Sequence, residues 1–310
     1  MTKLVTKNRP QLGIALIVLM AACFATMDTS AKYLGAFVPV LAMMWFRYLT
    51  QAVIMSVWLA RSASSGFRAR HPRFQVLRGC LLLATSSASF YGVQYLPVAE
   101  FTAINMLTPV VVTLLAGWVL HEHVSGLRWM LVGGGFLGAL IVIRPGSGLF
   151  GWAVLFPLLG ALSYASFQVL TSKLAALESP FTTHFYTGLT GTLILTPVLF
   201  LSPIDLVGLV QSTRPEHLAL MLGIGLMGTT GHLLLILALG YAPTATLMPF
   251  VYVQIAAAAV VSWLVFRHVP DGWAWVGMAV IALCGAASAW MNVRQATPPA
   301  SPVSADTIAG

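Results

Sequence analysis

The chain has 310 residues, of which 58% are hydrophobic and only 8% are charged. Ordinary globular proteins carry about 25% charged residues, so this chain has too few polar side chains to coat a water-facing surface, and lipid must cover the rest. The formal net charge of +8 is compatible with nucleic-acid binding. The basic residues gather in short segments between apolar runs, however, as they do in membrane proteins, and we expect no nucleic-acid partner.

Ten apolar segments are long enough to cross a bilayer, because a spanning helix needs about 20 mostly apolar residues. The breaks between them carry Gly or Pro, as at Pro97, Pro180 and Pro270. The sequence therefore predicts an all-α integral membrane protein, with a tail at residues 294–310 that is disordered. The ten predicted spans are residues 11–35, 38–60, 74–95, 98–120, 126–144, 149–174, 181–202, 217–241, 243–266 and 271–293.

The N-terminus and the loop charges predict how the chain lies in the membrane. Residues 1–10 are a basic start before an apolar run, which resembles a signal peptide; the run continues to about Gly35, so we expect an uncleaved first helix. Ten spans place both termini on one side, and that side carries most basic loop residues, whereas the other side has three, which are Arg144, Arg214 and Arg267. Basic loops mark the cytoplasm, so we predict two cytoplasmic termini. The residues on that side are Lys3, Lys7, Arg9, Arg61, Arg68, Arg70, Arg73, Arg78, Arg128, Lys173 and Arg294.

Short matches between the two halves indicate an internal repeat. Residues 29–32 resemble residues 170–173, residues 45–50 resemble residues 185–190, and His123-Val124 matches His268-Val269, at offsets of 141, 140 and 145 residues. The repeats would be residues 11–144 and 149–293, with five spans each. Because five is odd, the second repeat enters the membrane from the opposite face, which is the inverted arrangement of many secondary transporters. We expect a solute site near the midplane, between the halves.

Charged residues within spans are costly and usually functional. Asp28 and Lys32 lie four residues apart and share one face of the first helix. Arg47 lies in the second, and its forked guanidinium suits a carboxylate or phosphate. These residues either grip an anionic or zwitterionic solute, or form an internal ion pair, with Lys32 snorkelling to the interface. Asp28 and Glu100 are candidates for proton coupling, although Glu100 also suits the first turn of a helix for dipole reasons.

Uncharged polar and aromatic residues within the spans complete the predicted binding set. Buried amide and imidazole groups are expensive unless they are bonded, so Asn105, Gln168, His232 and Gln254 either line the site or bond neighbouring helices. Five aromatic residues either stack on a ring-bearing solute or serve as interface belt and packing. These five are Trp45, Tyr91, Tyr164, Tyr186 and Tyr252.

Three further patterns carry no predicted chemistry. Residues 133–138 satisfy a dinucleotide-binding spacing, but they lie within a span, where Gly134 and Gly138 favour close helix packing instead. His121 and His123 are too few for a metal site, and the cysteines are too scattered for a disulfide framework. We expect no cofactor and no metal.

Several segments together resemble the EamA-type transporters of the drug/metabolite transporter superfamily. The segment 95–104 is followed by Leu107-Thr108-Pro109 and then by Leu120-His121-Glu122, which is similar to the family's fourth helix. Residues 249–254 and 269–271 look like the ninth and tenth helices, and Lys32 and Arg47 match family positions. Arg267 stands where members often carry a Glu matching Glu122. The resemblance covers residues 11–293.

The resemblance implies a carrier of metabolites in the bacterial inner membrane, often an exporter, and some similar subgroups are linked to riboflavin or S-adenosylmethionine. Together with the spans, it predicts a secondary transporter that moves a small polar or amphipathic metabolite by alternating access, with proton coupling as a further option. Expected partners are the solute and the bilayer, and a homodimer stays open. The alternative is a membrane protein without transport, either an enzyme or a receptor or assembly factor; an enzyme would need a catalytic cluster that the scattered acids do not supply.

Overall fold

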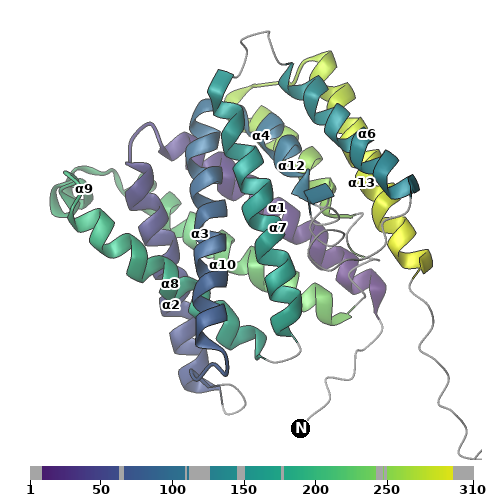
Figure 1. Ribbon diagram of the computed structural model, residues 1–310. Helices are drawn as coiled ribbons and strands as arrows, with labels where there is room; N and C mark the ends of the chain where they lie inside the picture. The colour runs from purple at the N-terminus through teal and green to yellow at the C-terminus, as the bar shows by residue number, and fades with distance from the viewer. Residues whose placement is uncertain are drawn as a thin grey trace, which may run out of the picture.

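The computed structural model describes residues 9–62, 66–108, 110–111, 126–144, 151–175, 178–241, 247 and 250–295. Over these ranges the regular structure is helical, without a strand (Figure 1). The helices are α1 (Pro10–Leu34), α2 (Val40–Arg61), α3 (Pro72–Tyr95), α4 (Val98–Asn105), α6 (Gly126–Ile143), the 3-10 helix η1 (Gly151–Val154), α7 (Leu155–Ala175), α8 (Pro180–Phe200), α9 (Leu206–Ser212), α10 (Pro215–Tyr241), α12 (Val253–Phe266) and α13 (Gly272–Gln295). The predicted all-α membrane fold is confirmed.

Several helix ends follow directly from the residues at them. α1, α3 and α8 begin with proline in the first turn, where the missing N–H costs nothing and the fixed φ suits a helix. The short α9 begins after Asp205, whose carboxylate accepts from Val207 N at 3.0 Å. This helix was not predicted, because seven residues are too few to give a spanning signal.

The predicted span 98–120 is interrupted within its described part. α4 ends at Asn105, and Met106 and Leu107 form a turn. Proline at position 109 has no N–H to donate to the carbonyl four residues earlier, which is that of Asn105, and the Thr108 hydroxyl donates to that oxygen instead, at 2.8 Å. Pro109 and Pro249 themselves lie outside the described residues, as do His121, Glu122 and His123.

The surface of the helices suits lipid. Among the described residues, five helical segments are long and apolar enough to cross a membrane, and α6, α12 and α13 contain shorter apolar stretches. Large apolar side chains point outward, with Phe200 71% exposed and Leu283 71% exposed. A water-soluble monomer rarely exposes so much continuous apolar surface. The five segments are Gln11–Leu34, Val40–Arg61, Pro72–Tyr95, Gly151–Thr171 and Pro215–Ala238.

Helices from the first half of the chain pair mainly with helices from the second half. α1 packs on α10, and α3 packs on α7; α2 packs on α8, α4 on α12, and α6 on α13. If each helix is replaced by its counterpart in the other half, the pair α1 and α10 becomes the pair α7 and α3, and each of the other three pairs stays the same. This pattern is expected of two related units. Figure 1 shows α6 beside α13 at one edge of the molecule and α2 near α8 at the other.

Two apolar cores hold this arrangement. One core contains Met43, Tyr48 and Phe90 and is built around α1, α2 and α10; the other contains Phe101 and Met278 and lies around α4, α6, α12 and α13. The close helix packing predicted for Gly134 and Gly138 is confirmed. A Cβ atom at Gly138 would lie 2.9 Å from the Gly277 carbonyl oxygen, and one at Gly134 would lie 2.6 Å from Cys284 Sγ.

Candidate functional site

Arg47 is a buried cation in the middle of the helix bundle. It lies on α2, and only 2% of the residue is exposed. Nη1 donates to Ser86 Oγ on α3 at 3.3 Å, and the same hydroxyl accepts from Tyr48 Oη at 2.9 Å. The guanidinium carbon lies 4.8 Å from the Tyr48 ring centre and 6.0 Å from that of Phe90. Arg47 Nε has no hydrogen-bond partner among the described residues.

Asp28 and Lys32 on α1 do not form the ion pair that was one reading of their spacing. Asp28 is 5% exposed and accepts a hydrogen bond from Ser89 Oγ at 2.9 Å. Lys32 Nζ instead donates to two backbone carbonyls at the end of α3, Val93 O at 2.5 Å and Leu96 O at 2.9 Å. Lys32 therefore ties α1 to the end of α3, while Asp28 lies on the same face one turn earlier, beside α3.

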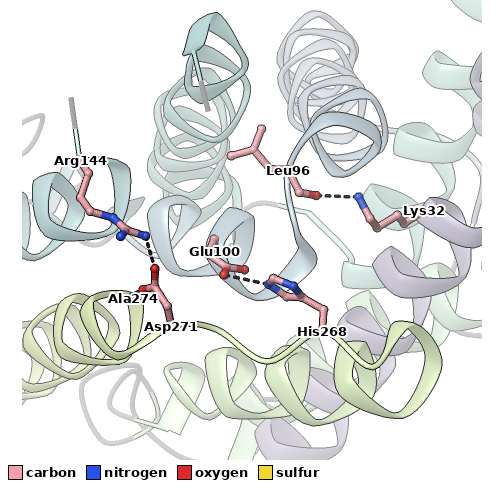
Figure 2. A network of polar contacts seen from close by, with 7 residues as sticks. All are labelled: Lys32, Leu96, Glu100, Arg144, His268, Asp271 and Ala274. Carbon is pink, nitrogen blue, oxygen red and sulfur yellow. Dashed lines mark hydrogen bonds and ion pairs between the residues drawn. The ribbon is translucent and has the colours of Figure 1, made fainter. Parts of the chain in front are cut away.

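A polar network closes the end of the bundle at which α3 meets α4 (Figure 2). Glu100, in the first turn of α4 and 4% exposed, lies with Oε1 3.0 Å from His268 Nε2. Arg144 Nη2 pairs with Asp271 Oδ2 at 2.5 Å. The Ala274 backbone N–H and Arg144 together hold the pKa of the Asp271 carboxyl below its usual value. Both contacts join the first half of the chain to the second.

Arg78 differs from its predicted position in a cytoplasmic loop. It lies within α3 and is 3% exposed. Its Nε donates to Thr171 Oγ1 at 2.7 Å, and its Nη1 donates to Thr187 Oγ1 at 2.7 Å. Arg78 was counted with the basic loop residues although the predicted span 74–95 includes it, and the structure shows that it lies inside α3.

Three further residues of the predicted binding set, Trp45, Tyr91 and His232, lie on α2, α3 and α10, the helix that carries Arg47 and two that contact it. Trp45 Nε1 donates to Thr196 Oγ1 at 2.9 Å. The His232 ring lies 5.0 Å from that of Phe24 and 6.1 Å from that of His184. Tyr91 is half-buried and packs against the apolar core that contains Phe90.

Other predicted residues lie elsewhere. Tyr252 belongs to the core around α4 and α12, and its hydroxyl has no partner among the described residues. The same holds for Asn105 Oδ1, which lies 2.8 Å from where a Cβ atom at Gly160 would be. Tyr164 stacks on Phe167 at 5.7 Å, and Tyr186 contacts the Phe185 ring edge-on. Gln168 is half-buried and Gln254 is buried.

Sequence reasoning missed several buried polar residues. Gln51 and Gln75 are completely buried, and His184 is 2% exposed. Spacing offered a signal, because Gln51 lies four residues after Arg47 and Gln75 three before Arg78, so each shares a helix face with an arginine. In the described part of the chain, no three His, Cys, Asp or Glu residues gather as a metal site would require.

Comparisons with known proteins identify the family. The EamA-like transporter family matches residues 11–144 and again residues 151–289. Similar curated proteins include the S-adenosylmethionine uptake transporter of Rickettsia prowazekii, 23% identical with 84% of this chain and 86% of that protein covered. The riboflavin transporter of Rhizobium johnstonii is 28% identical, with 89% and 90% covered, and the pseudopaline exporter CntI of Pseudomonas aeruginosa is 24% identical, with 87% and 93% covered.

A solved structure supports the fold. This crystal structure matches 92% of this chain and 96% of its own with a TM-score of 0.60, at 19% identity. The double family match agrees with the pairing of helices between the two halves. The chain therefore belongs to the EamA-like transporter family and is a membrane transporter, not an enzyme.

Proposed function

We propose that the chain is a secondary transporter that carries a small polar or amphipathic metabolite across the bacterial inner membrane, with both termini in the cytoplasm. Its moving parts are two inverted five-helix halves, residues 11–144 and 149–293. The pairing of helices supports two related units, because α1 packs on α10 as α7 packs on α3, and α2, α4 and α6 pack on α8, α12 and α13. Substrates named for its relatives, S-adenosylmethionine and riboflavin, are the first solutes to try.

The observation that carries the proposal is the state of Arg47. A buried guanidinium is expensive unless it is paired and fully hydrogen-bonded, yet Arg47 has a neutral hydroxyl at 3.3 Å and an Nε with no partner among the described residues. No carboxylate in the described residues lies within 4 Å of it, and the nearby Asp28 carboxylate interacts with its charge without a direct contact. An anionic or strongly polar group of the solute would supply what Arg47 lacks.

Reconstitution in proteoliposomes tests the role of Arg47. We expect Arg47→Gln to reduce solute flux by about tenfold or more, since a lost hydrogen bond to a charged group weakens binding by that order. Arg61→Gln is the matched control, because Arg61 lies on the same helix and is exposed; it should transport as the wild type does. Wild-type flux by Arg47→Gln with riboflavin and S-adenosylmethionine would refute the assignment.

We further propose that Asp28 is the better coupling candidate. It is buried next to Ser89 on the face of α3 that also contacts Arg47, whereas Glu100 already has His268 as a partner. Flux measured in the same proteoliposomes under an imposed pH gradient distinguishes Asp28 from Glu100 as the coupling residue. Flux through Asp28→Asn should no longer respond to the gradient, and flux through Glu100→Gln should still respond. A full response in Asp28→Asn contradicts the proposal for this residue.

A further inference from the structure

A second group of buried polar residues surrounds the first turns of α8, apart from Arg47. We call it the α8 cluster, and it consists of Gln51, Gln75, Arg78, Thr183, His184 and Thr187. Each is buried, with exposed fractions from 0% for Gln51 to 7% for Thr183. Three helices contribute side chains, α2, α3 and α8. Apolar residues at these positions would pack without unmet hydrogen bonds, so the polarity of the cluster calls for a function.

Arg78 brings a positive charge that the described residues do not balance. Besides the two threonine hydroxyls already described, Nη1 donates to Thr183 O at 3.3 Å, and the guanidinium lies 4.4 Å from the Phe167 ring centre. Every one of these acceptors is neutral, and no carboxylate in the described ranges lies within 4 Å. A buried cation in this setting favours an anionic ligand group.

Gln51 adds an acceptor whose orientation is fixed by its neighbour. Its Nε2 lies 3.0 Å from the His184 carbonyl oxygen and 3.2 Å from His184 Nδ1. A carbonyl oxygen only accepts, so the amide nitrogen must face it, and Nδ1 must accept as well, which places the ring proton on Nε2. The other end of the amide, Gln51 Oε1, is then an acceptor, and it has no partner among the described residues.

Gln75 presents a second acceptor of the same kind. Its Nε2 donates to Thr183 Oγ1 at 3.1 Å, and its Oε1 is buried without a partner in the described part of the chain. The unmet groups of the cluster are therefore one uncompensated cation, two amide oxygens and the N–H at His184 Nε2, which has no hydrogen-bond partner among the described residues.

We propose that the α8 cluster is a second solute-binding position on the transport path, which takes a group carrying an anionic oxygen next to an N–H donor. The anionic oxygen lies at Arg78, and the N–H donates to Gln75 Oε1, because Gln75 lies three residues before Arg78 on the same face of α3 and both residues contact Thr183. This inference rests on the proposed transport function. Arg78 is eight residues from Ser86 on α3, the partner of Arg47, so the two arginines are about 12 Å apart along the helix, while Gln51 lies one turn from Arg47 on α2. A solute would occupy them in turn.

Three small probes test separately the recognition of the anionic oxygen and the recognition of the N–H donor. Hippurate has a carboxylate and an adjacent amide N–H; hippuramide lacks the charge, and 3-benzoylpropionate replaces the N–H by a methylene. The readout is the apparent thermal stability of the purified full chain in an uncharged detergent, since a ligand that binds the folded state raises it. For the wild type we expect hippurate to bind about tenfold more tightly than either of the other two.

Variants of Arg78 and Arg47 show which of the two arginines binds the carboxylate of hippurate. Arg78→Gln should bind hippurate and hippuramide equally, whereas Arg78→Lys, which keeps the charge and guards against a folding defect, should still prefer hippurate. If Arg78→Gln retains the wild-type preference, or hippurate does not stabilise the wild type at tens of millimolar, the inference is wrong. If Arg47→Gln alone abolishes the preference, the inference fails while the proposed role of Arg47 stands.

Discussion

At the scale of single residues, the sequence was most informative where a charge stood in an apolar segment. Asp28 and Arg47 could be selected because burial of a charge is costly, and both are buried. The sequence did not single out Arg78, Gln51 and Gln75 as site residues, because the spans are apolar on nearly every face. A linear pattern therefore does not show which face of a helix turns inward. The interior face becomes visible only when neighbouring helices are placed, as α8 is against α2 and α3.

Gly228 tests how closely Arg47 is enclosed. A Cβ atom at Gly228 would lie 2.7 Å from Arg47 Nε and 3.2 Å from Met27 Sδ, whereas one at Gly223 on the same helix meets nothing within 4 Å. We expect Gly228→Ala to lower the apparent melting temperature in detergent and to reduce solute flux, because the added methyl group must displace the buried Arg47 side chain. Gly223→Ala should be neutral or stabilising, since alanine favours helix. Equal behaviour of the two variants would show that Arg47 is not tightly held.

At the scale of elements, eight of the ten predicted spans coincide with helices to within about two residues at each end, once η1 is counted with α7. Their limits were predictable because proline and glycine stand at them. The break after Asn105 was not predicted, because hydropathy continues through it even though the hydrogen bonding does not. α9 was missed because it is too short to span a membrane.

Crossing of α6 and α13 depends on glycine at one point. A Cβ atom at Gly138 would lie 2.9 Å from the Gly277 carbonyl oxygen, whereas one at Gly133 on the same helix would meet nothing within 4 Å. Gly138→Ala must push the two backbones apart, so we expect a destabilisation of about 1–3 kcal/mol, the usual cost of overpacking. Thermal unfolding in detergent, with Gly133→Ala as the control, measures it. A Gly138→Ala protein as stable as the control would mean that this contact can relax without cost.

At the scale of the whole molecule, three short matches at offsets near 141 residues predict a repeat, and the ends of α1 and α7 lie 141 residues apart, at Leu34 and Ala175. The network at one end of the bundle was not predictable. Glu100 meets His268, and Arg144 meets Asp271, across more than 120 residues of sequence. Such contacts depend on how the halves face each other, which no local pattern encodes.

Alternating access predicts that distances between the halves change while distances within a half do not. Tyr95 and Val269 are exposed, 58% and 59%, and in the sequence Tyr95 directly precedes Leu96 and Val269 directly follows His268. With Cys23, Cys80 and Cys284 replaced, spin labels at Tyr95→Cys and Val269→Cys should give two distances whose populations shift when a transported solute is added. A solute shifts such an equilibrium only by its different affinity for the two states, so the shift should follow binding.

The matched control for this measurement is the pair Tyr95→Cys and Phe37→Cys, because Phe37 is 53% exposed and lies in the first half, between α1 and α2. Rigid halves require a single distance for this pair that does not change with solute. If the pair within the first half changes as much as the pair between the halves, α1 and α3 move separately and the halves are not the moving units. If neither pair changes although the solute stabilises the protein, binding occurs without opening this end, and the Glu100–His268 contact is a permanent brace.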